Sequence, residues 1–301
     1  MNRLAIYCVI YNRGDYIYKS VSSLLDNSPS NTTIVLVDDK STDNTIDILN
    51  QFAIKDSRVV IIANPINLGF TTSLKNAIEV IENERKHDYI AIHGAGDIAM
   101  PGRFESQTFF LDSNEDYSFV GCRHQQIKED SSNLPSSEKH GVVELSSLLE
   151  NAPFWTHGTV MYRAVDYFES KGYDSQFKYC QDWALYTKLL LIGKGCVLNI
   201  DPYTKVVFRD GATFSPIKRV EQLKYAFLIC NQLEPNDLSD SMSSLQFYLT
   251  KEILRSNLAL IKKKEKLILS DWRSYLSSNN SDNLRYRSIL LYLNKLFLKL
   301  V

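Results

Sequence analysis

An acidic residue, Asp97, follows a short apolar run and two glycines. The run covers residues 89–93, and Gly94 and Gly96 lie between it and the carboxylate. The apolar run predicts a buried strand, and ligands of open α/β sheets bind beyond the carboxyl ends of the strands. Glycines there let a ligand approach the backbone closely. A carboxylate in this position suits a divalent cation. Pro101 suits the first turn of a following helix, so the alternative is that Asp97 only caps that helix.

Two successive carboxylates, Asp38 and Asp39, follow a second apolar run over residues 33–37. At a strand end such a pair can accept hydrogen bonds from a base imide or from ribose hydroxyls. For Asp38 a role as a turn or cap residue is an equal alternative, whereas ligand contact is favoured for Asp39. Other strand ends and basic groups complete a predicted site for a nucleotide diphosphate: Tyr11, Asn12, Arg13, Asn67, Gly69 and Lys75.

A further carboxylate, Asp182, opens a strongly apolar helical pattern. A helix packed on the sheet would hold this group near the pocket floor, and a general base needs such a fixed position. An N-cap role is the alternative. Four aromatic or polar side chains could contact a sugar acceptor, although Trp and His more often pack in the core. They are Trp155, His157, Gln181 and Trp183.

Strands that alternate with helices must position these groups. Apolar, β-branched runs predict strands over residues 4–11, 33–37, 59–63 and 89–93. Helical patterns follow them, reaching about residue 25 and covering 45–52 and 71–84, with Asp43 placed to cap the second helix. Continuously apolar strands in this alternation predict an α/β fold with a doubly wound, mostly parallel sheet covered on both faces.

The alternation becomes less regular after Asp97. Predicted helices cover 103–111, 145–149 and 182–192; predicted strands cover 117–127, 159–162, 197–200 and 205–208; and a polar loop over 128–140 is expected to be a mobile flap. From residue 217 onward the pattern predicts only helices. We therefore expect a domain over residues 1–215 and a helical extension over 216–301.

The composition is that of a globular chain in a reducing compartment. The sequence has 301 residues, 44% of them hydrophobic, which is enough for a full core. Its 5 cysteines show no C-x-x-C spacing, so neither a zinc site nor a disulfide framework is indicated. The N-terminal apolar run lacks the length and cleavage site of a signal peptide, and no apolar run approaches the length of a membrane-spanning helix. A cytoplasmic location is expected.

The net charge of −1 hides an asymmetry. Residues 251–301 carry eleven Lys or Arg and four Asp or Glu, a net charge of +7, which leaves −8 for residues 1–250. Within residues 284–301 there is no acid, and basic and polar side chains share one side of a helical wheel while apolar side chains line the other. Such a helix can lie on an anionic membrane surface. Docking on the protein's own core, or on a second subunit, is the alternative.

The order of these motifs resembles the family-2 inverting glycosyltransferases of the GT-A fold. The resemblance extends from residue 4 to about residue 215. Its most specific part is Val-Asp-Asp-Lys-Ser-Thr-Asp-Asn-Thr over residues 37–45. The other parts are Tyr11-Asn12-Arg13, Asn67-Leu68-Gly69 with Lys75-Asn76, Asp97 with Pro101, Gln181-Asp182-Trp183, and Arg209 with Ser215.

By this resemblance, Asp39 would bind the base, Asp97 would hold a Mg²⁺ or Mn²⁺ ion on the diphosphate, and Asp182 would be the general base. The reaction implied is a single displacement with inversion, from a nucleotide-sugar donor such as a UDP-sugar to a saccharide or lipid-linked saccharide acceptor. Two features depart from the family pattern, the metal loop and the residue before Asp182. Gly94 and Gly96 replace carboxylates of the metal loop, and Gln181 replaces Glu.

Many bacterial relatives in this family act on lipid-linked saccharides, so the resemblance implies a peripheral enzyme of polysaccharide or O-antigen assembly at the inner face of the plasma membrane. Nucleic acid is not expected as a partner, and an oligomer remains open. A nucleotide-sugar-binding protein without transferase activity is the main alternative. A nucleotidyltransferase is remote, because the segment after the first strand, Asn12-Arg13-Gly14, is not a glycine-rich phosphate loop.

Overall fold

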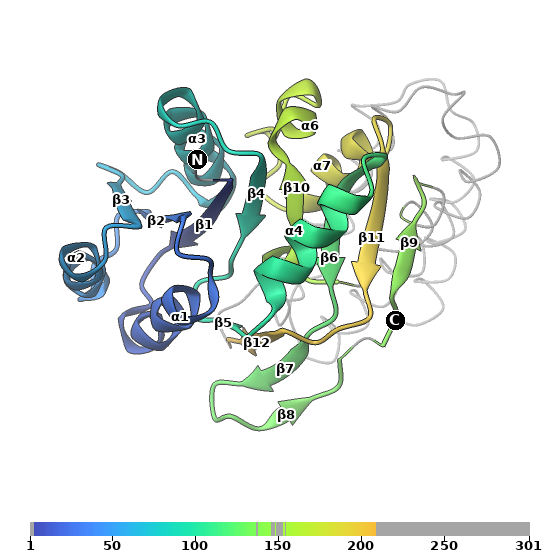
Figure 1. The fold of residues 1–301 in the computed structure, drawn as a ribbon. Coiled ribbons are helices and arrows are strands. Elements are labelled where there is room, and N and C mark those ends of the chain that lie inside the picture. Colours follow the sequence, from blue (N-terminus) through green and yellow to red (C-terminus); the bar gives the residue numbers. More distant parts are fainter. Residues whose placement is uncertain (1–2, 137, 146–147, 149–152, 154, 209–301) are drawn as a thin grey trace, which may run out of the picture.

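Four parallel strands form the first half of an eight-stranded sheet, in the order β3-β2-β1-β4 (Figure 1). They are β1 (Leu4–Ile10), β2 (Thr32–Asp38), β3 (Val59–Ala63) and β4 (Tyr89–Ile92). The pairing register sets Ile10 beside Asp38, and Asp38 beside Ala63. The carboxyl ends of β1, β2 and β3 therefore meet at one edge of the sheet, as the apolar runs predict.

This computed structural model describes residues 3–208 except 137, 146–147, 149–152 and 154. Residues 209–301 lie outside the described part of the chain. They include the end of the domain predicted over 1–215 and the whole expected extension over 216–301, with its basic helix over 284–301. Part of the helix predicted over 145–149 also lies outside the described residues. Among the described helices, none has the length and apolar character needed to cross a membrane.

Helices cover both faces of the sheet, since successive strand residues point to opposite sides. On one face, α1 (Gly14–Asn27), α2 (Thr45–Lys55) and α4 (Arg103–Ser113) pack against β-strand residues such as Ile6 and Leu36. On the other face, α3 (Phe70–Glu84) packs against residues such as Tyr7 and Val35. This double covering explains why the strands are apolar throughout and confirms the doubly wound arrangement.

The second half of the sheet mixes strand directions. β10 (Met161–Arg163) runs antiparallel between β4 and β6 (Tyr117–Cys122), and β11 (Lys194–Leu198) lies parallel to β6 and antiparallel to β9 (Gly141–Val143). The strand predicted over 159–162 begins later, because η1 (His157–Thr159) is a short 3₁₀ turn. The helices α6 (Ala164–Glu169), which was not predicted, and α7 (Gln181–Leu189) lie beside this half.

A second, four-stranded sheet has the order β5-β12-β7-β8. It consists of β5 (Ile98–Ala99), β12 (Tyr203–Val207), β7 (Gln125–Lys128) and β8 (Asn133–Leu134). The prediction of one strand over 117–127 was wrong: the chain leaves β6 at Arg123, whose guanidinium binds Asn199 and Asp201 beyond β11. The segment expected as a polar flap over 128–140 contains β8. This sheet brings β12 against the loop that carries Asp97.

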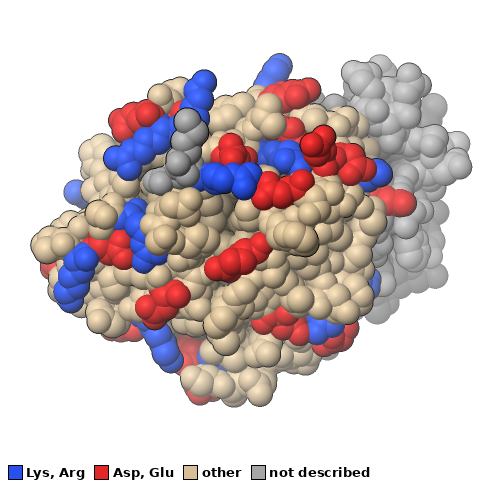
Figure 2. Space-filling model, viewed as in Figure 1, with Lys and Arg blue, Asp and Glu red and all other residues tan. Residues whose placement is uncertain are grey.

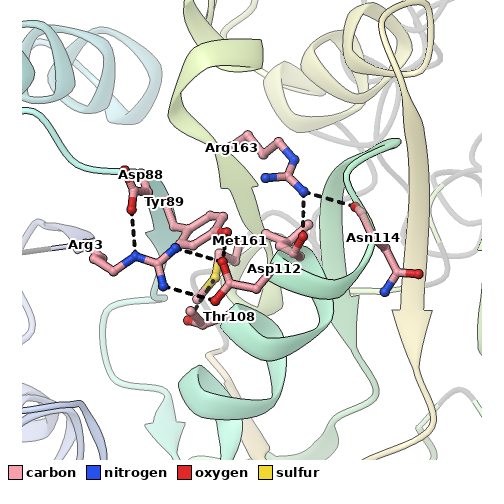
Figure 3. Close-up of polar contacts among 9 residues, drawn as sticks. Arg3, Asp88, Tyr89, Thr108, Asp112, Asn114, Met161 and Arg163 are labelled. Atoms are coloured by element: carbon pink, nitrogen blue, oxygen red, sulfur yellow. Dashed lines mark hydrogen bonds and ion pairs between the residues drawn. The ribbon is translucent and has the colours of Figure 1, made fainter.

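An ion-pair cluster lies at the opposite, amino end of β1 and β4 (Figure 3). Arg3 Nε donates to Asp88 at 2.7 Å, and Arg3 Nη2 donates to Asp112 at 2.7 Å. The Tyr89 hydroxyl donates to the same Asp112 carboxylate at 2.6 Å. Since Asp112 belongs to the last turn of α4, the cluster attaches that helix to the sheet, and the other end of α4 carries Arg103 beneath the candidate site.

Candidate functional site

Hydrogen bonds join the loops that follow β1 and β2. The Asn12 side-chain oxygen accepts from the Thr42 N–H at 2.8 Å, and Asp43 accepts from the Gly14 N–H at 3.0 Å. Asp43 also accepts from the Thr45 N–H at the start of α2, but the N-cap position predicted for Asp43 is taken by Asn44. Asn12 has a left-handed φ of 51°, which Asn tolerates better than most residues. Asn12, predicted to bind the nucleotide, therefore uses its side-chain oxygen to shape the loop.

The Asp39 carboxylate is 2% exposed and accepts four hydrogen bonds from the protein. Its Oδ1 accepts from Asn64 Nδ2 at 2.9 Å, from the Leu68 N–H at 2.8 Å and from the Ser73 hydroxyl at 2.7 Å. Its Oδ2 accepts from the Gly69 N–H at 2.9 Å. Four bonds use about the full accepting capacity of a carboxylate. This side chain holds the turn before α3, and its contact with the base stays a prediction.

Asp38 and Tyr11 lie at the adjoining strand ends. Asp38 accepts from the Ser41 N–H at 3.2 Å through Oδ2, and Tyr11, directly after β1, is 46% exposed. Asn67 donates from Nδ2 to the Asp39 carbonyl at 3.0 Å, so the loop before α3 lies beside them. A Cβ built on Gly69 would meet no atom within 4 Å. The Gly69 backbone therefore borders open space at the edge where the sequence predicts a nucleotide.

The two predicted phosphate-binding cations have different surroundings. The Arg13 guanidinium lies over the Phe208 ring, with Cζ 4.4 Å from the ring centroid, and Nη1 donates to the Asn12 carbonyl at 3.0 Å. Lys75 lies further along α3, where its amine pairs with Glu79 at 2.5 Å. Of the two, Arg13 is the one at a strand end.

Asp97 is 7% exposed and is bonded to β12 through both carboxylate oxygens. The Tyr203 hydroxyl donates to Oδ2 at 2.6 Å, and the Val206 N–H donates to Oδ1 at 2.7 Å. Burial raises the pKa of Asp97 above its usual value, and these hydrogen bonds oppose the shift. The carboxylate thus acts as an anchor between the loop and the second sheet.

The two glycines of this loop are closely covered. A Cβ on Gly94 would come within 2.2 Å of Asp97 Oδ2, and one on Gly96 would come within 2.6 Å of the Phe208 ring. Gly96 also has a φ of +96°. Within the described part of the chain, no three His, Cys, Asp or Glu side chains gather around a common point, so Asp97 has no second acidic ligand beside it. The residues present therefore do not fit the Mg²⁺ or Mn²⁺ ion expected at Asp97.

A buried polar network that the sequence analysis missed lies under the loop. Arg103, which is 0% exposed, donates through Nη2 to the carbonyls of Ile92 at 2.7 Å and Gly158 at 2.6 Å. His93 packs between Arg103 and Ser20, and burial, with the Arg103 charge, lowers the His93 pKa to about 3. Arg103 thus joins the end of β4 to η1. A charged residue at the start of a helix looks like a surface residue in the sequence, so no local pattern marks it.

The predicted acceptor residue His157 lies between the start of α3 and α7. Its ring centroid is 5.7 Å from that of Phe70, directly after Gly69, and its Nε2 is 2.6 Å from the Tyr173 hydroxyl. Burial lowers the His157 pKa, and the negative charge of Asp182 opposes that shift. Asp182 also raises the Tyr186 pKa, second to burial. Asp182 lies in the first turn of α7, one turn before Tyr186, whose ring centroid is 6.3 Å from that of His157.

The two tryptophans predicted to contact an acceptor sugar are buried, and that contact stays a prediction. Trp155 is 6% exposed and Trp183 is 4% exposed. The Trp155 ring lies 5.3 Å from Tyr186 and 6.1 Å from Phe119 in the core. Both side chains belong to the hydrophobic core, as the packing alternative expects. Gln181, at the start of α7, is half-buried and next to Asp182.

The donor-side and acceptor-side elements are in direct contact. The Thr71 hydroxyl of α3 donates to the Phe177 carbonyl at 2.8 Å, in the segment that leads to α7. A Cβ on Gly158 would lie 3.1 Å from the Gly94 backbone nitrogen, so η1 packs on the Asp97 loop. The strand ends, η1 and the start of α7 thus form one region. On the face in Figure 2, Lys and Arg intermingle with Asp and Glu rather than forming a field of one sign.

Known glycosyltransferases are similar to this chain in sequence. The chain is 32% identical over 178 residues to "Putative glycosyltransferase EpsE" of Bacillus subtilis, a match of 58% of this chain and 60% of that relative. It is 31% identical over 115 residues, 38% of the chain and 43% of the relative, to Escherichia coli WfaP, a UDP-Glc:alpha-D-GlcNAc-diphosphoundecaprenol beta-1,3-glucosyltransferase. The chain thus spans about three fifths of the length of EpsE.

Solved structures share the fold. The Staphylococcus aureus TarS 1-349 complex with UDP-GlcNAc has a TM-score of 0.71 at 17% identity, covering 92% of this chain and 80% of TarS 1-349. A Pyrobaculum calidifontis mannosyltransferase, PcManGT, in complex with GDP-Man and Mn2+ has a TM-score of 0.59 at 13% identity, with 96% and 83% covered. The fold is the GT-A, nucleotide-diphospho-sugar transferase type that the motif order predicted. Since the profile of Glycosyl transferase family 2 matches residues 6–169, the chain belongs to that family.

Proposed function

We propose that this protein is an inverting glycosyltransferase that moves a sugar from a UDP-sugar to a hydroxyl of a saccharide or lipid-linked saccharide. The observation that carries the proposal is the position of His157 between Phe70, at the strand ends, and α7, whose first turn carries Asp182. Membership of family 2 supports the reaction class. The named substrates of WfaP and the ligand of TarS support a UDP-sugar donor.

On the donor side, Asp38, Tyr11 and the Asn67–Gly69 turn would contact the base and ribose. Asp38 keeps acceptor capacity beyond its bond to the Ser41 N–H, which suits a base imide or a ribose hydroxyl. Asp39 and Asn12 would act indirectly, by positioning the turn before α3 and the loop after β1. Arg13 would meet the phosphates.

In the reaction, Asp182 would remove the proton from the acceptor hydroxyl as its oxygen attacks the anomeric carbon. The bond from that carbon to the nucleoside diphosphate breaks on the opposite face, so the configuration inverts. Asp182 Oδ1 accepts from the Trp183 N–H at 2.9 Å, which fixes the carboxylate at the start of α7. A base held in this way is available at the moment of transfer. His157 and Gln181 would orient the acceptor.

A second function is kept because of one observation, the absence of carboxylates at Gly94 and Gly96. A protein of this fold that binds a nucleotide sugar without transferring it would place the same residues around the nucleotide. Its Asp182 would then have no role in turnover.

Measurements on a panel of UDP-, GDP- and dTDP-sugars test both functions. A ligand that binds the native state raises its melting temperature by mass action. We expect a UDP-sugar to give the largest shift, and saccharide acceptors to accelerate release of free UDP. Donor binding without acceptor-dependent release would favour the binding protein, and no shift with any nucleotide sugar would reject both functions.

We further propose a place at the cytoplasmic face of the membrane in cell-surface polysaccharide assembly. The basic and apolar pattern of residues 284–301 supports this location, and the glucosyl acceptor named for WfaP is linked to diphosphoundecaprenol. Lipid-linked acceptors would then be met at the membrane surface.

A further inference from the structure

We infer that this chain binds the diphosphate of its donor without a resident divalent cation, and that Arg13 supplies the positive charge in its place. The inference rests on the proposed function, because it concerns the phosphates of the same nucleotide-sugar donor. It replaces the metal role that the sequence suggested for Asp97.

The first support is the use that the protein makes of the Asp97 carboxylate. Both oxygens accept hydrogen bonds at 2.6 and 2.7 Å from β12, and the side chain is 7% exposed. These two bonds fix the orientation of the carboxylate toward β12, and a cation would have to reach its remaining lone pairs inside a nearly closed site. Asp97 is therefore committed to holding the second sheet against the loop.

The second support is that the loop is closed around its glycines. The Asp97 carboxylate covers Gly94, and the Phe208 ring covers Gly96, so neither position has room for a ligating side chain. The positive φ of Gly96 adds backbone strain to any replacement. Mg²⁺ usually takes one or two protein carboxylates together with phosphate oxygens and water. This loop offers one carboxylate, Asp97, and both of its oxygens are bonded to β12.

The third support is the position of Arg13. The ring of Phe208 contacts Gly96 on one side and lies 4.4 Å from the Arg13 guanidinium carbon, so the cation is about one aromatic ring from the loop. Stacking on the ring holds the planar guanidinium in a defined orientation. A guanidinium can bind two phosphate oxygens at once, a geometry that an ammonium group lacks.

Other nearby cations fit this role less well. Lys75 is paired with Glu79 on α3, and Arg103 is buried beneath the loop with its Nη2 bound to two carbonyls. Lys205 lies in β12, and its charge acts on Asp97. Lys205 is therefore the competitor that the experiment must separate from Arg13.

Calorimetric titration of the full chain with UDP and with uridine tests the inference. In the wild type we expect UDP affinity to change less than about twofold between EDTA and Mg²⁺ or Mn²⁺. Arg13→Gln should weaken UDP binding by about tenfold to a hundredfold, the range for a lost charged hydrogen bond, and leave uridine binding unchanged. Arg13→Lys should recover only part of the loss. Lys19→Gln removes one positive charge from an exposed position of α1, the helix that begins directly after Arg13, and should behave like the wild type.

Each contrary result has its own meaning. A loss of UDP affinity above tenfold in EDTA, or a phosphate-dependent loss in Lys205→Gln but not in Arg13→Gln, overturns the inference while the proposed donor class stands. Equal loss of UDP and uridine in a folded Arg13→Gln protein, checked by its thermal melt, also overturns it. Wild-type protein that binds neither UDP nor uridine overturns the proposed UDP-sugar donor, and the inference with it.

Discussion

The Asp97 carboxylate occupies the space into which a side chain on Gly94 would project. A Cβ on Gly94 would come within 2.2 Å of Asp97 Oδ2. The same oxygen accepts the Tyr203 hydroxyl at 2.6 Å, and that hydroxyl accepts from the Gly94 N–H at 3.0 Å. The glycine and the carboxylate therefore depend on each other, and both depend on β12.

Replacement of Gly94 by Ala should destabilise the protein. Because the added methyl would collide with a buried, bonded carboxylate, we expect the free energy of unfolding to fall by about 1–3 kcal/mol, the usual cost of overpacking. Urea denaturation measures it. Gly121→Ala is the matched control, since a Cβ there meets atoms only at 3.6 Å or more. Equal stability of the Gly94→Ala protein and the wild type would show that Asp97 is not held where the structure has it.

Asp39→Asn and Asp38→Asn should separate positioning from binding. In Asp39→Asn an amide replaces an oxygen that accepts from the protein, so we expect the free energy of unfolding to fall by about 2 kcal/mol. Asp38→Asn should cost less stability and weaken UDP binding directly. Denaturation and calorimetry on both variants give the comparison. If Asp39→Asn is as stable as the wild type but loses UDP binding, Asp39 contacts the base after all.

Asp182→Asn should stop sugar transfer and leave donor affinity nearly intact, because a base acts in the transition state rather than in recognition of the nucleotide. The expected loss of rate is about 10²- to 10⁴-fold. Asp166→Asn, in the first turn of α6, is the control for losing a carboxylate at a helix start. Parallel losses of UDP affinity and rate in Asp182→Asn would exclude the assignment as base.

Stability should fall as the pH is lowered from about 6.5, where an unfolded histidine begins to bind a proton. Burial lowers the pKa of His93 to about 3 and that of His124 to about 4. A histidine with a depressed folded pKa contributes stability that is complete above about pH 6.5 and is lost toward the folded pKa. At about pH 5 each would cost about 2 kcal/mol.

Denaturation of wild type and His93→Gln at pH values between about 5 and 7.5 checks this. The raised pKa of Asp97 acts in the opposite direction, and the comparison with the variant removes that contribution. We expect a shallower pH dependence in His93→Gln. Identical slopes in the two proteins would mean that His93 can take up a proton within the fold.

The basic residues of the segment 284–301 should bind the protein to anionic vesicles at low salt. Each Lys or Arg near such a surface contributes about 1 kcal/mol. Replacing Arg285, Arg287, Lys295 and Lys299 by Gln should abolish co-sedimentation and leave activity on a soluble acceptor unchanged, with neutral phosphatidylcholine vesicles as the control. Wild-type protein that ignores anionic vesicles, or a variant with an altered oligomeric state, would indicate a packing role.

The sequence by itself determined the strands β1–β4, the helices that follow them and the strand-end positions of Asp38 and Asp97. These features depend on local apolar periodicity, which is readable in one chain. The parallel arrangement followed from alternation, and so did the edge at which the candidate residues gather.

Only the tertiary structure decided which protein groups bond to each carboxylate. Asp39 and Asp97 look alike in the sequence, each an acid after a buried strand. Yet Asp39 accepts hydrogen bonds from the turn before α3, whereas Asp97 accepts one from Tyr203, which lies 106 residues away in a second sheet. Such partners are absent from the local pattern because they come from distant segments. The surroundings of each carboxylate are therefore set by long-range packing and not by its own motif.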